Sequence, residues 1–115
     1  MGNELSKPEV QLRQLSKRAM HYANMAYTLL VKDNFNEAAV VGYVNAAYSL
    51  VCTARSIYIS NIAKLEHNDI DEFFCAFEEY VRDVLGFVSD KNSECYPRST
   101  FENLKEKYDY SVLSQ

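Results

Sequence analysis

The chain has 115 residues, of which 48% are hydrophobic and 24% are charged, and its net charge is −4. These values are typical of one ordinary globular domain that is long enough to bury a core of its own, so we expect a single domain over residues 1–115. Three glycines and two prolines are too few for a loop-rich fold or a β-sandwich. The net acidity argues against non-specific nucleic-acid binding as the main role.

Four helices are predicted, in chain order, over residues 7–32, 35–63, 70–88 and from about 100. Each is preceded by a start signal in which a helix-capping residue is followed three positions later by glutamate. The four signals are Ser6–Glu9, Asn34–Glu37, Asp69–Glu72 and Ser99–Glu102. A break in the second helix is expected at Ser60-Asn61. The pattern predicts an all-α fold, namely a four-helix up-and-down-type bundle.

The second helix is the most unusual part of the sequence, because residues 38–59 contain one charge, Arg55, and no polar side. Such a helix must be covered on most sides by other helices, by a second copy of the chain, or by lipid. Asn45 and Arg55 are costly in lipid, which favours a buried helix at the centre of the bundle and no membrane span. The fourth helix is too short to cover the second one fully, so we expect a homodimer or a larger homo-oligomer.

Small residues recur along this second helix at helical spacing. Gly42, together with Ala38, Ala46 and Ser49, predicts a close contact between helices. Asn45 lies in the same stripe, and a lone polar residue in a helix seam often fixes the register of the contact.

Two groups of residues are candidate binding sites. Arg13, Lys17 and His21 lie one turn apart on the polar side of the first helix, where they form either an anion patch or a solvated face. Arg55 either grips a phosphate or a partner's carboxylate, or pairs with an acidic residue of the third helix.

No motif in the chain requires catalysis, a cofactor or a metal. The third helix carries Glu72, Glu78, Glu79 and Asp83, but no glutamate is followed three residues later by histidine, as carboxylate metal sites in bundles require. Cys52, Cys75 and Cys95 have no metal-ligand spacing, and the first ten residues have no apolar signal core. We therefore expect a non-enzymatic protein in the reducing cytoplasm.

Residues 19–58 resemble the front half of a HEPN domain, in which an amphipathic helix turns sharply into a helix rich in Ala and Tyr. The matching pieces are AMHYANMAYTLLVKDNF and EAAVVGYVNAAYSLVCTARSIYI. Members that cleave RNA carry Arg-x(4–6)-His, which this chain lacks. The resemblance therefore implies a non-catalytic relative that acts as an interaction module through dimerisation and partner binding. The alternative is a nucleotide- or RNA-binding protein that uses the basic face of the first helix.

Overall fold

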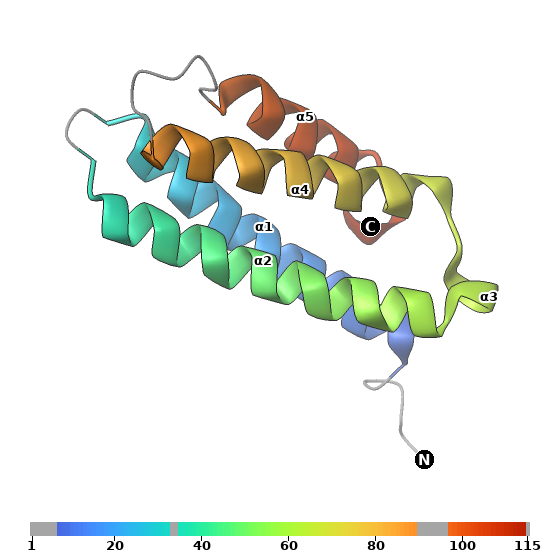
Figure 1. The fold of residues 1–115 in the computed structure, drawn as a ribbon. Helices are drawn as coiled ribbons and strands as arrows, with labels where there is room; N and C mark the ends of the chain where they lie inside the picture. Colours follow the sequence, from blue (N-terminus) through green and yellow to red (C-terminus); the bar gives the residue numbers. More distant parts are fainter. Residues whose placement is uncertain (1–6, 33–34, 90–96, 115) are drawn as a thin grey trace.

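The computed structural model describes residues 7–32, 35–89 and 97–114, and these residues are almost entirely helical (Figure 1). The elements are α1 (Pro8–Leu30), α2 (Glu37–Ser60), α3 (Ile62–Leu65), α4 (Asn68–Ser89), α5 (Arg98–Asp109) and a final 3-10 turn, η2 (Val112–Ser114). No strand occurs in the described residues. The predicted all-α fold class is confirmed, and so is the break after Ser60, where the short α3 begins a new direction.

The predicted start signals are wrong in detail. The side chain of Asn36 caps α2 by accepting a hydrogen bond from the Ala39 N–H at 3.1 Å. Asp69 lies inside the first turn of α4, and Ser99 lies inside the first turn of α5. A capping residue must directly precede the helix, so a shift of one residue removes it from that role. Ser6 and Asn34 lie outside the described residues.

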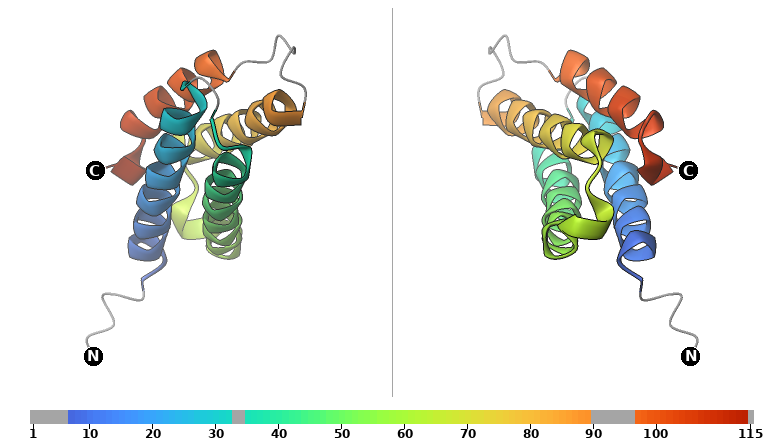
Figure 2. Two further views of the ribbon diagram at one scale, coloured as in Figure 1. Left: turned by 90° about the vertical axis from the view of Figure 1, so that its left-hand side faces the viewer. Right: turned by 90° about the vertical axis from the view of Figure 1, so that its right-hand side faces the viewer.

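The helices are arranged in two layers, with α1 beside α2 and α4 beside α5 (Figure 2). α1 and α2 form the closest pair of helices in the fold. Alanines allow this close approach, because their small side chains let the two backbones come together. The buried alanines of the two helices are Ala19, Ala23, Ala26, Ala47 and Ala54.

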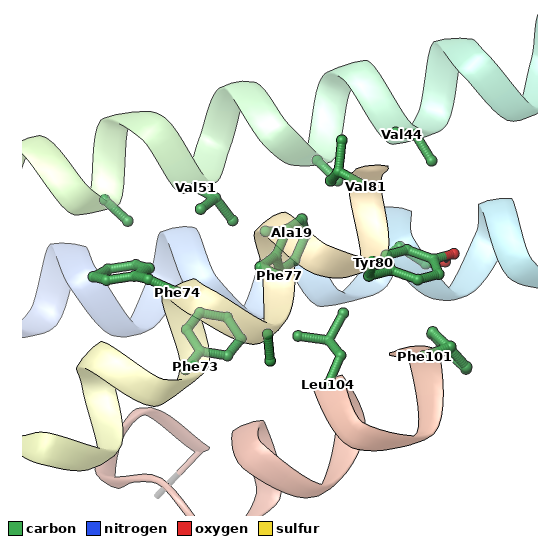
Figure 3. Close-up of a cluster of buried hydrophobic side chains, with 14 of the residues drawn as sticks. Ala19, Val44, Val51, Phe73, Phe74, Phe77, Tyr80, Val81, Phe101 and Leu104 are labelled. Carbon is green, nitrogen blue, oxygen red and sulfur yellow. The ribbon is translucent and has the colours of Figure 1, made fainter. Parts of the chain in front are cut away.

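Large aromatic side chains of α4 fill the space between the layers (Figure 3). Phe73, Phe77 and Tyr80 are all fully buried. The Tyr80 hydroxyl donates a hydrogen bond of 2.9 Å to the Ala23 carbonyl of α1, which satisfies the only polar atom of that side chain. Because α4 supplies these side chains, it occupies the middle of the core, and the expected central place of the second helix is not met.

One side of α2 faces solvent, which corrects two expectations from the sequence. We call this side the outer face of α2; it consists of Ala38, Gly42, Asn45, Ser49, Cys52 and Ser56, all exposed. Among the described residues, no atom of another helix lies within 4 Å of the position that a Cβ on Gly42 would take, so Gly42 makes no close contact between helices within the chain. Asn45 is likewise exposed and lies in no seam between helices of the chain.

The other helices of the chain pack against only the inner side of α2. Val40, Val44, Ala47, Val51, Ala54 and Tyr58 make up that buried row. No helix in the described residues is both long enough and apolar enough to cross a membrane.

Candidate functional site

The outward side of α1 carries a row of basic residues. Arg13, Lys17 and His21 follow one another at one-turn intervals, and all three are exposed. Glu9, one turn before Arg13, is the one carboxylate of α1, so the row keeps a net positive charge. The predicted polar side of the first helix is therefore present in the structure.

A shallow groove of about 510 Å³ runs between α1 and α2 beside this row. Leu15 and Ile57 give it an apolar floor, and Lys17 and Arg18 stand on its α1 side. Thr53 lines the α2 side, but its hydroxyl already donates to the Ser49 carbonyl at 3.1 Å. The groove is thus apolar inside and basic along one edge.

Arg55 projects from α2 toward α4 and not toward the groove. Its guanidinium donates a hydrogen bond of 2.8 Å to a carboxylate oxygen of Glu78, and it lies 5.4 Å from the centre of the Phe74 ring. Both charged side chains keep about a third of their surface in solvent. The sequence left open whether Arg55 grips an anion or pairs within the chain, and the structure places it in an internal pair that ties α2 to α4.

The electrostatics of this pair suit a structural role. The hydrogen bond from Arg55 holds the pKa of Glu78 below its ordinary value of 4.5, and the same bond raises the pKa of Arg55. Nearby, the electrostatic interaction with Cys52 raises the pKa of Tyr48. A carboxylate with a lowered pKa is a poor proton acceptor, so this cluster fastens two helices and does not suit general-base chemistry.

The Arg55–Glu78 pair gives a pH-dependent contribution to stability. Because the pKa of Glu78 is lower in the folded chain, the stabilisation is complete above its ordinary value of 4.5 and is lost as the pH falls through the lowered value. We expect Glu78→Gln to lower the free energy of unfolding at pH 7 by about 0.5–1 kcal/mol, as for other partly exposed pairs. The difference from the wild type should shrink as the pH falls through the lowered pKa of Glu78.

Urea unfolding at several pH values measures this difference. Glu79→Gln is the matched control. Glu79 is the exposed neighbour of Glu78, so this substitution removes the same charge without breaking the pair with Arg55. If the Arg55–Glu78 pair stabilises the fold, only Glu78→Gln should show a loss of unfolding free energy that shrinks as the pH falls. The same pH-dependent loss in both variants would assign the effect to net charge.

The five residues predicted for binding do not form one site. Arg13, Lys17 and His21 share a face of α1, Asn45 lies on the outer face of α2, and Arg55 points to α4. Sequence reasoning did not identify the two partners of Arg55, which are Glu78 and Phe74. The position of Arg55 in an apolar helix predicts an acidic partner, but it does not distinguish among the several carboxylates of α4.

The acidic side of α4 contains no metal-binding arrangement. Glu72 accepts hydrogen bonds from Asn68 on its own helix, at 3.1 Å, and from Lys107 of α5, at 3.3 Å. Within residues 7–32, 35–89 and 97–114, no three His, Cys, Asp or Glu side chains gather closely enough to hold a metal ion. Two carboxylates of α4 link it to its neighbours, Glu78 to α2 and Glu72 to α5.

No family model matches this chain, and neither a curated protein nor a solved structure is similar enough to count as a match.

Proposed function

We propose that this protein is a non-catalytic helical interaction module that works as a homo-oligomer in the cytoplasm. Its four long helices, α1, α2, α4 and α5, make an up-and-down bundle, and α3 is a turn within the connection from α2 to α4. The outer face of α2 is the surface through which copies of the chain meet. The HEPN-like pattern of residues 19–58 supports the same proposal, because that family acts through dimerisation when its ribonuclease motif is missing.

The composition of the outer face of α2 is the observation that carries the proposal. No exposed residue from Ala38 to Ser60 is charged, over nearly the whole length of a helix of 24 residues. The exposed sides of α1, α4 and α5 all carry several charges. Charged residues are depleted at the centres of protein interfaces, and this side of α2 shares that feature.

The flanks of the outer face support association as well. Tyr43, Leu50 and Ile57 on the side of α1 are only partly buried, and Ile59 is 60% exposed. Apolar side chains of this size gain free energy when a second surface covers them. The outer face therefore combines a centre without charges with apolar side chains along its edges.

Light scattering during gel filtration tests the proposal. We expect at least twice the monomer mass of 13.2 kDa at micromolar concentration. Ser49→Arg should weaken self-association by about 100-fold, because each copy then brings an unpaired charge to the contact, and like charges at an interface cost several kcal/mol. Arginine is a better helix former than serine, so α2 should remain intact.

Ser99→Arg is the matched control, since Ser99 is exposed on α5 in the other layer. It should leave the mass unchanged. A wild-type mass of 13.2 kDa at every concentration would contradict the proposal. An oligomer that survives Ser49→Arg but dissociates with Ser99→Arg would move the contact to α5.

The unbalanced charge of α1 favours a second candidate function, in which Arg13, Lys17 and His21 bind a nucleotide or RNA. Positive side chains attract phosphates, and such binding weakens steeply as salt is added. Fluorescence anisotropy with labelled single-stranded RNA at low salt tests this function. Binding that is lost in Arg13→Glu/Lys17→Glu supports it, and the absence of binding by the wild type excludes it.

A further inference from the structure

The groove between α1 and α2 has an apolar floor and a charged edge. Leu15 and Ile57, both partly buried, form the floor, and the exposed side chains of Lys17 and Arg18 lie along the edge that α1 provides. The hydroxyl of Thr53 on the α2 side already donates to a carbonyl of its own helix, so it offers no free donor to a ligand. A ligand of this groove therefore needs apolar groups for the floor and an anionic group for the edge.

The charge of this groove has a single sign. Its lining includes two cations and no carboxylate. Four smaller hollows on the described part of the chain each contain a glutamate, namely Glu9, Glu78, Glu72 or Glu102. None of the ion pairs between described residues involves Lys17 or Arg18. Both cations can therefore pair with an acidic ligand without breaking a contact of the fold.

We propose that this groove binds an amphipathic helix of a partner protein, which places large apolar side chains on the floor and acidic side chains beside Lys17 and Arg18. The inference goes beyond the proposed function, because it concerns a second surface and a different partner. In this mode of recognition, apolar anchors three or four residues apart enter a hydrophobic groove. Opposite charges along the edge fix the orientation of the bound helix and speed its association.

The length of the groove suits two turns of a partner helix. On α1 its lining begins at Gln11 and ends at Arg18, and on α2 it consists of Thr53 and Ile57. The backbone rises about 10 Å from Gln11 to Arg18, which equals two helical turns. A partner helix of this length places two large apolar side chains, one turn apart, over the floor. Its neighbouring positions then bring carboxylates to the basic edge.

The floor fits a protein helix better than it fits RNA or a membrane surface. Proteins that hold unpaired bases stack them on aromatic side chains, and Leu15 and Ile57 offer no aromatic ring. Membrane-binding surfaces insert protruding apolar side chains into the lipid, whereas the apolar side chains of this groove form its floor. The most exposed large apolar side chains of the described residues line no part of it; they are Val31, Ile59, Ile62 and Tyr110.

Titration of a designed peptide, followed by fluorescence anisotropy, tests the proposal. The probe is a labelled helical peptide with leucines in one stripe and glutamates beside that stripe. One control peptide has lysines in place of the glutamates, and another has the same composition with its leucines scattered around the helix. We expect the glutamate peptide to bind the wild type with a Kd of about 100 μM or tighter, and both controls to bind about tenfold more weakly.

Three variants locate the bound peptide. Lys17→Glu/Arg18→Glu should weaken the glutamate peptide about tenfold and should bind the lysine peptide more tightly than the wild type does. Ile57→Ala should also cost about tenfold, because the floor loses most of a large apolar side chain while alanine keeps α2 helical. Arg82→Glu/Lys105→Glu is the matched control, since these exposed residues of α4 and α5 carry the same two charges. It should leave peptide binding little changed.

Several results would overturn the proposal. Absence of binding by the wild type at about 1 mM glutamate peptide is one. Equal binding of the peptide with scattered leucines would reduce the effect to charge attraction. Binding that is unchanged in Ile57→Ala would place the peptide outside the groove. Labelled single-stranded RNA or anionic lipid vesicles that bind the wild type but not Ile57→Ala, when the peptide does not bind, would assign the groove to those ligands.

Ser49→Arg separates this inference from the proposed function. Ser49 does not line the groove, so the variant changes the outer face of α2 and leaves the groove lining intact. It should bind the glutamate peptide at least as tightly as the wild type. Loss of peptide binding in Ser49→Arg would place the peptide on the outer face of α2 and overturn the groove as its site. A wild type that binds the peptide as a monomer would contradict only the proposed self-association.

Discussion

Phe77→Ala should cost about 3–5 kcal/mol of the free energy of unfolding, the range for removing a fully buried phenylalanine. Phe77 is 0% exposed, and its ring lies 5.8 Å from the ring of Phe73 and 6.5 Å from that of Tyr80, in edge-to-face arrangements (Figure 3). Truncation leaves a cavity between the two layers that these rigid rings cannot fill. The loss is a large part of the 5–15 kcal/mol that stabilises a typical domain.

Chemical denaturation at one fixed protein concentration measures this loss, since self-association also contributes to stability. Tyr110→Ala is the control, because this aromatic side chain is 76% exposed and its removal leaves no cavity. The free energy of unfolding should change little in the control. Equal and small changes in both variants would contradict the central place of α4 in the core.

Leu104→Ala should have the second-largest effect, about 2–5 kcal/mol, and should act on α5 first. α5 buries only Phe101 and Leu104, and Leu104 is 0% exposed. Phe101 also stacks on Tyr27 of α1, with ring centres 4.3 Å apart. With Leu104 removed, one buried side chain remains to hold a helix of 12 residues.

Hydrogen exchange tests this local effect, because it reports the opening of single segments. Leu104→Ala should speed the exchange of the α5 amides more than it speeds the exchange of the α1 and α2 amides. Glu106→Ala, at an exposed position of the same helix, should leave the exchange of α5 unchanged. Uniformly faster exchange in all helices would mean that α5 does not open separately.

The sequence predicts the helices of this protein well because their apolar residues recur at helical spacing. The row of α4 that contains Phe73, Phe77 and Tyr80 is buried as its spacing indicates. Capping was less predictable, because Asn34 and Asn36 both precede α2, and a shift of two residues decides which side chain caps the helix.

The environment of α2 could not be predicted in the same way. Val40, Val44 and Val51 form its buried row. The sequence also predicted a close helix contact at Gly42, and for Asn45 it left open a contact within the chain or between copies. Small residues are compatible with a tight contact and with an exposed surface, and their spacing alone does not distinguish the two. The sequence also could not identify Glu78 as the partner of Arg55, because that pairing depends on how α4 crosses α2.

Small-angle X-ray scattering across a concentration series tests self-association most directly, since it yields mass and size in solution together. A single chain has a mass of 13.2 kDa and a Cα radius of gyration of 14.8 Å. We expect wild-type protein at micromolar concentration to scatter with at least twice this mass and a larger radius, and Ser49→Arg to return both to the single-chain values. Wild-type scattering that keeps the mass of one chain throughout the series would contradict the account.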